Sequence, residues 1–86
     1  MREITRDNWF QSVRYNERRL CLMLACNVVG EREQLYGVIR ELFPELAPRV
    51  GTHSSYYHEL TTFNDHPKVT FDMIEKIMHE WKLRYC

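Results

Sequence analysis

Apolar side chains recur at helical spacing over much of this 86-residue chain, and no stretch alternates in the manner of a strand. The clearest amphipathic segment covers residues 31–43, with acidic residues at its start and Pro44 directly after its end. Its apolar positions follow the i, i+3, i+4, i+7 rule and comprise Leu35, Val38, Ile39, Leu42 and Phe43. Residues 31–43 are therefore predicted to form a helix that buries one face.

The first third of the chain contains a second apolar stretch. Residues 17–29 are apolar nearly all round, which predicts a buried helix that Gly30 ends as a left-handed cap. Upstream, Thr5 is suited to cap a helix that begins near Arg6. The polar run over residues 14–19 leaves two arrangements open, one helix from about 6 to 28 or two helices separated by a break, and the break is favoured.

The second half predicts two more helices. Residues 44–51 form a turn-rich connection with room for one helical turn, and Thr52 or Ser54 is suited to cap a short helix that runs to Leu60. A loop is expected over 61–69, followed by a final helix after Thr70. The chain is thus predicted to be a single domain over residues 1–86, an all-α compact bundle of four to five helices.

The final helix carries a seam of large apolar side chains at alternating spacings of three and four: Phe71, Ile74, Met78, Trp81 and Tyr85. Such a seam suits packing on the core of the same chain, which is the favoured interpretation. It equally has the spacing that pairs two helices in a coiled coil, so a homodimer through residues 71–85 is the alternative.

Composition and charge narrow the functional classes. With 12 basic and 12 acidic residues the formal net charge is zero, whereas dedicated nucleic-acid modules usually have a basic excess. The charge is uneven, because residues 1–26 hold five arginines against three acids while residues 27–48 are net acidic. A chain of this length buries only about 60 to 65% of its unfolded surface, so its core is modest.

The sequence also limits the cellular compartment and the kinds of catalytic or metal site that are expected. No apolar run approaches the roughly 20 residues of a membrane span, and the start lacks a secretion signal, so a cytoplasmic protein is predicted. Three cysteines without close-set pairs fit reduced thiols. Because His53 and His58 are five positions apart, one helix would not present both to a metal ion. With no phosphate loop or nucleophile–base pair either, we predict no enzyme, no metal and no cofactor.

One spacing points to a more specific function. A short side chain, a glycine four residues later, and apolar or aromatic residues six and nine positions beyond it form the packing pattern of a helix-turn-helix. These positions are Leu46, Ala47, Gly51, Tyr57 and Leu60, and Ile74, Ile77 and Trp81 continue in an apolar-periodic helix. Residues 46–81 thereby resemble the DNA-binding half of the lambda-repressor/Cro-like helix-turn-helix family. The chain departs from the pattern at Phe43, Pro48 and Thr52, and Pro48 would shorten or distort the first helix.

The resemblance implies DNA binding and assigns roles by position. In such a motif the second helix meets base edges while flanking residues hold phosphates. The residues expected to face the groove are His53, Ser54, Ser55, His58 and Thr62. Those expected to contact the backbone are Arg49, Tyr56 and Lys68. On this hypothesis the protein is a small transcriptional regulator that binds double-stranded DNA.

A different class fits the same composition. Tyrosine, tryptophan and arginine dominate protein interfaces, so the chain would also suit a module that docks on a partner protein. By analogy, this class comprises small phage- or plasmid-type helical inhibitors and adaptors. The expected anchors are Tyr56, Tyr57 and Phe63, or a patch of Arg14, Arg18 and Arg19 facing an acidic partner.

Overall fold

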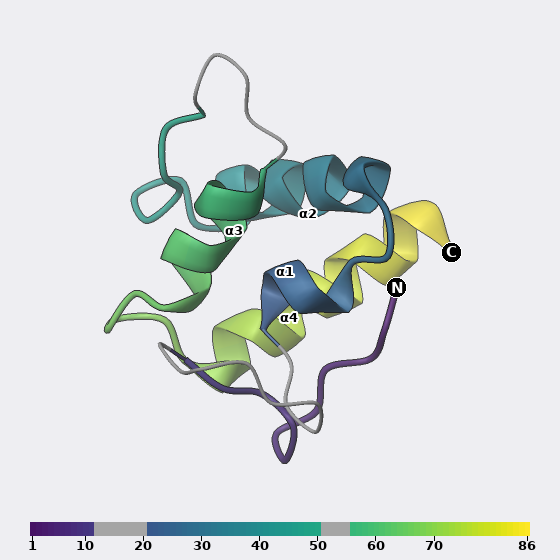
Figure 1. The fold of residues 1–86 in the computed structure, drawn as a ribbon, viewed down its shortest axis with the longest axis horizontal. Coiled ribbons are helices and arrows are strands. Elements are labelled where there is room, and N and C mark those ends of the chain that lie inside the picture. Colours follow the sequence, from purple (N-terminus) through teal and green to yellow (C-terminus); the bar gives the residue numbers. More distant parts are fainter. Residues whose placement is uncertain (12–20, 51–55) are drawn as a thin grey trace.

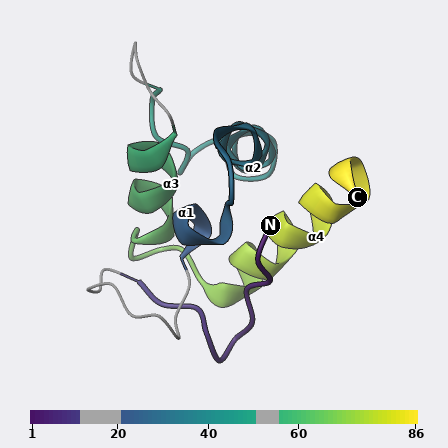
Figure 2. The same cartoon turned by 45° about the vertical axis from the view of Figure 1, so that its right-hand side comes forward.

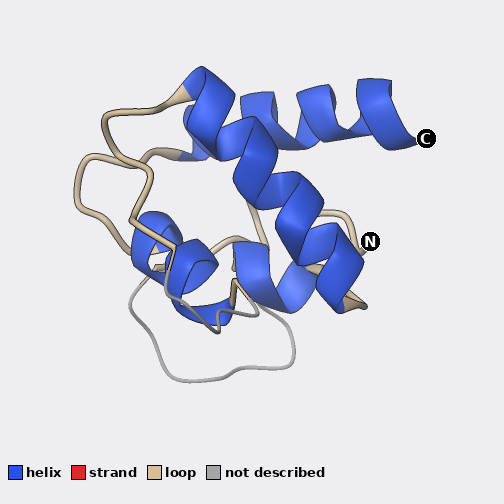
Figure 3. Ribbon diagram, turned by 90° about the horizontal axis from the view of Figure 1, so that it is seen from above, coloured by secondary structure: helices blue, strands red, loops and turns tan. Residues whose placement is uncertain are grey.

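The computed structural model describes residues 1–11, 21–50 and 56–86 and shows helices joined by loops (Figure 3). Its helices are α1 (Leu22–Ala25), α2 (Val29–Leu42), α3 (Tyr57–Asn64) and α4 (Phe71–Tyr85). Both α1 and α2 contact α3, and α2 also packs against α4 (Figures 1 and 2). The predicted all-α compact bundle is confirmed.

The amphipathic helix of the sequence is α2. Leu35, Val38 and Ile39 are completely buried, as the spacing predicts. The helix begins at Val29, two residues earlier than expected, because the backbone turns helical directly after the extended Val28. It ends at Leu42, one residue before the predicted end, with Phe43 N–H closing the last turn on the Ile39 carbonyl before Pro44.

The helix predicted to begin near Arg6 is wrong for residues 6–11. Thr5 and Asn8 form a single turn instead, in which the Asn8 side chain accepts from Thr5 N–H at 2.7 Å and donates to the Glu3 carbonyl at 3.2 Å. Such local side-chain bonds to the backbone compete with helix formation. Residues 12–20, and with them the choice between one helix and two, lie outside the described part of the chain.

The long buried helix predicted up to Gly30 is also wrong where the structure describes it. Of residues 21–28 only Leu22–Ala25 is helical, Cys26 already has extended backbone, and Val29 belongs to α2. Gly30 lies inside α2 and has no positive φ, so it caps nothing. The stretch is buried only in part, since Leu22 and Ala25 are fully buried whereas Val28 and Val29 are more than half exposed.

The short helix of the second half is displaced from its prediction. It runs over Tyr57–Asn64, so its last four residues fall in the expected loop. Its N-cap is Tyr56 in the left-handed region (φ 66°), and the predicted caps Thr52 and Ser54 lie outside the described residues. The extension brings Phe63 and Asn64 into the core, where both are fully buried, and tertiary packing thereby overrides the loop signal.

The last helix starts after Thr70, as predicted. Four members of its seam, Phe71, Ile74, Met78 and Trp81, are buried inside the chain, whereas Tyr85 is 47% exposed. The favoured interpretation of the seam as core packing is therefore confirmed. A homodimer through residues 71–85 could not use these side chains without opening the core.

Asn64 is a buried polar hub that ties three segments together. Its Oδ1 accepts from the indole N–H of Trp9 at 2.8 Å and from Leu22 N–H at 3.1 Å. Its Nδ2 donates to the Phe10 carbonyl at 2.9 Å and to an Asp65 carboxylate oxygen at 3.1 Å. The N-terminal segment, the start of α1 and the end of α3 thus share one amide, which is fully hydrogen-bonded as a buried polar group must be.

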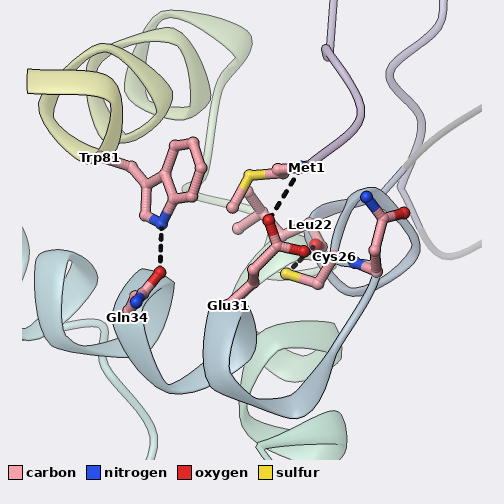
Figure 4. A network of polar contacts seen from close by, with 7 residues as sticks. Met1, Leu22, Cys26, Glu31, Gln34 and Trp81 are labelled. Carbon is pink, nitrogen blue, oxygen red and sulfur yellow. Dashed lines mark hydrogen bonds and ion pairs between the residues drawn. The ribbon is translucent and has the colours of Figure 1, made fainter. Parts of the chain in front are cut away.

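A second polar network joins the chain start to α1, α2 and α4 (Figure 4). Glu31 pairs with the Met1 amino group at 2.8 Å and accepts from Asn27 N–H at 2.8 Å. These bonds, that to the amino group first, hold the pKa of the Glu31 carboxyl below its usual range. On the neighbouring turn, the Trp81 indole donates to the Gln34 side chain at 3.0 Å, so the network also fixes α4 on α2.

Burial also determines the thiol pKa values of two of the three cysteines. Cys21 and Cys26 are buried free thiols and Cys86 is exposed. Loss of hydration raises the pKa of the Cys26 thiol from 9.0 to about 12, with a smaller contribution from the Glu31 charge. The pKa of Cys21 is raised by the same loss of hydration.

The Cys26 shift predicts a fall in stability at alkaline pH. Below about pH 9 the thiol is protonated in both states and contributes no pH dependence. From there to about pH 12 it ionises only in the unfolded chain, so the free energy of unfolding decreases over that window. Urea unfolding at pH 7, 9 and 10.5 measures the slope. Cys26→Ala is expected to make the slope shallower but not flat, because the pKa of the Cys21 thiol is raised as well. Cys86→Ala is expected to leave the slope unchanged, and a Cys26→Ala slope as steep as that of the wild type would contradict this origin.

None of the helices in the described ranges is long and apolar enough to cross a membrane.

Candidate functional site

Over residues 43–50, the described part of the connection between α2 and α3, there is no helix of the length that a helix-turn-helix requires. Residues 44–46 form a turn in which Leu46 N–H and Ala47 N–H both bond the Phe43 carbonyl, at 3.1 and 3.2 Å. From Ala47 to Val50 the chain has no regular structure. Pro44 and Pro48 explain this, since each removes a backbone donor and clashes with a preceding turn. The bond from Ala47 N–H closes one helical turn, as the sequence allowed, but no helix continues from it, and Leu46 and Ala47 pack against the core.

The same connection instead forms one wall of a groove. The Tyr36 hydroxyl donates to the Pro48 carbonyl, and the Tyr36 ring lies 5.3 Å from the ring of Tyr56, the N-cap of α3. This ties residues 48–50 and the start of α3 to the buried side of α2. The groove encloses about 520 Å³ and is lined by Tyr36, Arg40, Pro44, Ala47, Pro48, Arg49 and Val50.

The groove is basic. Arg40 and Arg49 are both exposed, and no carboxylate lines the space between its walls. Within the described ranges neither guanidinium has an ion-pair or hydrogen-bond partner. Three other cations are ion-paired: Arg6 pairs with Asp72 at 3.1 Å, Lys82 with Glu3 at 3.6 Å, and Arg84 with Glu41 and Glu80. We call this site, defined by Tyr36, Arg40, Pro48, Arg49 and Val50, the basic groove.

The outer face of α3 extends from the basic groove. His58 and Thr62, one turn apart, are exposed, and Tyr57 is 47% exposed with its ring edge-on to His58 at 5.6 Å. The only acid of the helix, Glu59, is buried and does not face solvent. Beyond the C-terminal end, Lys68 is exposed, and its backbone N–H donates to His66 Nδ1 at 3.0 Å.

The structure brings part of the predicted DNA-contact set together. Arg49 and Tyr56 lie at the N-terminal end of α3, His58 and Thr62 on its outer face, and Lys68 past its other end. His53, Ser54 and Ser55 lie outside the described residues. Sequence reasoning missed Arg40, because its position in the last turn of α2 marks it only as exposed; its proximity to Arg49 arises from the fold.

The residues predicted to anchor a protein partner differ in their exposure. Phe63 as an anchor is wrong, since its side chain is completely buried, with its ring 6.2 Å from that of Phe43. Tyr56 is half-buried against Tyr36, so only Tyr57 remains as an exposed aromatic of that set. The patch of Arg14, Arg18 and Arg19 lies outside the described ranges.

Among the residues that the structure describes, no three histidine, cysteine or acidic side chains are grouped to hold a metal ion. Comparisons with known proteins add no constraint: no family model, no curated protein and no solved structure matches this chain.

Proposed function

We propose that the protein binds double-stranded DNA through the outer face of α3, with backbone phosphates held by the basic groove at one end and by Lys68 at the other. The observation that carries the proposal is the placement of cations at both ends of a helix whose only acid is buried, cations that pair with none of the residues the structure describes. It does not depend on a helix-turn-helix, since the first helix of that motif is not formed by residues 43–50.

Dimensions support this arrangement. The eight residues of α3 span about 12 Å at ~1.5 Å per residue, close to the ~12 Å width of the major groove. Phosphates on the two sides of the groove would then meet the cations at the two helix ends. Between them, His58 and Thr62 present groups that can donate and accept hydrogen bonds at base edges.

The charge distribution predicts weak, moderately salt-dependent binding. Arg40, Arg49 and Lys68 provide three phosphate contacts, in a molecule with no net charge. Three contacts give a slope of about −2.7 in log affinity against log salt, so raising salt from about 50 to 200 mM lowers affinity about 40-fold. A repressor with six to ten contacts loses about 10³ to 10⁵ over this range.

Fluorescence anisotropy with a random duplex at the two salt concentrations tests the proposal. Arg49→Gln and Lys68→Gln are expected to weaken binding to every sequence and to reduce the salt slope by about 1 each. His58→Ala should instead alter sequence preference in a selection from random duplexes.

The matched control is Lys76→Gln, which removes from α4 an exposed cation that has no ion pair with any described residue. It should leave the affinity unchanged. Absence of binding at about 50 mM salt would reject the proposal, and equal losses from Lys76→Gln and Arg49→Gln would reject the assigned surface. The alternative of a protein partner would then be pursued by pull-down, with Tyr57→Ala as the variant expected to lose the partner.

A further inference from the structure

We infer that the basic groove is a binding site for a phosphate monoester joined to a flat ring system, the chemistry of a nucleoside 5′-monophosphate and of the 5′-phosphorylated end of a DNA strand. If the ligand is the end of a DNA strand, the inference rests on the proposed function. If the ligand is a free nucleotide, the inference depends only on the groove.

The charge of the groove selects an anion. Two guanidinium groups line one space without a carboxylate, and neither has a partner in the part of the chain that the structure describes. Guanidinium presents a planar fork of donors that matches phosphate oxygens, and two forks can share the two charges and three terminal oxygens of a monoester. A backbone phosphodiester, with one charge and two free oxygens, would satisfy this pair less fully.

The walls offer apolar surface beside the two arginines. The other lining residues are Tyr36, Pro44, Ala47, Pro48 and Val50, of which Tyr36 is almost fully buried and Val50 is 42% exposed. Proline rings and aliphatic side chains offer apolar surface on which a base can lie. The volume of about 520 Å³ falls in the ~300–1,000 Å³ range of small-molecule sites, which combine apolar walls with a few placed polar groups.

The groove is also held in shape before any ligand arrives. The bond from the Tyr36 hydroxyl to the Pro48 carbonyl fixes the wall that carries Arg49, and Tyr36 itself is almost fully buried in the core. Arg40 projects from the last turn of α2, a rigid helix. A preformed site loses less affinity to ordering of its residues when it binds.

Titration of the full chain with adenosine 5′-monophosphate, followed by nuclear magnetic resonance, tests the inference. The backbone signals of Tyr36, Arg40, Arg49 and Val50 should shift. Adenosine and inorganic phosphate are each expected to bind at least about tenfold more weakly, because each makes only one half of the contacts. Arg40→Gln and Arg49→Gln should each weaken the nucleotide at least about tenfold; both side chains are exposed, so the fold is retained. Lys68→Gln should have no effect.

Equal affinities for the nucleotide and adenosine, or an unchanged affinity in Arg40→Gln, would overturn the inference. Duplexes with and without a 5′-phosphate separate the two sources: tighter binding of the phosphorylated duplex assigns the site to strand ends, and equal binding assigns it to free nucleotides.

The two proposals fail independently. Nucleotide binding without duplex binding rejects the proposed DNA function and keeps this site. Duplex binding that is weakened by Lys68→Gln, together with no nucleotide binding, keeps the proposed DNA function and rejects the nucleotide site.

Discussion

Replacement of Asn64 by alanine is expected to lower the free energy of unfolding by about 3 kcal/mol or more. The amide is completely buried, and its removal leaves the Trp9 indole N–H, the Leu22 N–H and the Phe10 carbonyl without their partner. An unsatisfied buried polar group costs about 1–3 kcal/mol. For a small domain with a total stability on the order of 5–10 kcal/mol, this change removes a large share.

Urea unfolding of Asn64→Ala measures the loss, and Asn27→Ala is the matched control because Asn27 is exposed. The control should change stability by less than about 0.5 kcal/mol. Asn64→Asp offers a finer test, since it keeps an acceptor for Trp9 and Leu22 but loses the donor to Phe10 and places a second carboxylate beside Asp65. It should be destabilising at neutral pH. Equal stability of Asn64→Ala and Asn27→Ala would show that Asn64 is not a structural hub.

Truncation of Phe63 to alanine is expected to lower the free energy of unfolding by about 3–5 kcal/mol, the usual cost of emptying a buried aromatic site. The ring has no exposed surface and faces the Phe43 ring. Because such a loss can unfold a marginal domain, Phe63→Leu provides a second variant, expected to cost about 1 kcal/mol as a change between similar apolar side chains.

Tyr57→Ala is the control for Phe63, because the two aromatics lie on the same helix and Tyr57 is 47% exposed. Its cost should be below about 1 kcal/mol. Thermal and urea unfolding of the three variants decide between a core residue and a surface anchor at Phe63. A Phe63→Ala protein as stable as Tyr57→Ala would restore Phe63 as a candidate contact for a partner.

The sequence predicted α2 and α4 well because their own residues determine both. In α2 the apolar period, the early acids and Pro44 all agree, and the structure buries Leu35, Val38 and Ile39 as expected. The start of α4 after Thr70 and its inward seam follow from the same local rules. Where helix propensity, apolar pattern and stop signals agree, the helix that the local sequence prefers is also the helix of the folded protein.

Other segments were mispredicted because distant partners decide them. The N-terminal segment is held by Asn64, more than 50 positions away, which accepts from the Trp9 indole and donates to the Phe10 carbonyl. The Gln11 side chain similarly donates to the carbonyls of Asn64, His66 and Val69. The periodicity of a sequence does not reveal hydrogen bonds between distant residues. The sequence pattern near Arg6 therefore gave no sign against a helix.

For the candidate site, the resemblance in the sequence predicts a set of DNA-contact residues, although its first helix is not formed over residues 43–50. The predicted set comprises Arg49, His53, Ser54, Ser55, Tyr56, His58, Thr62 and Lys68. The sequence determined that the chain is helical and which faces of two helices are apolar, because those properties arise between residues three or four positions apart. Only the tertiary structure decided that Arg40 and Arg49 share a groove and that Phe63 and Glu59 turn inward. Proximity between separate segments depends on how whole faces pack, and this is not encoded in the spacing of any one segment.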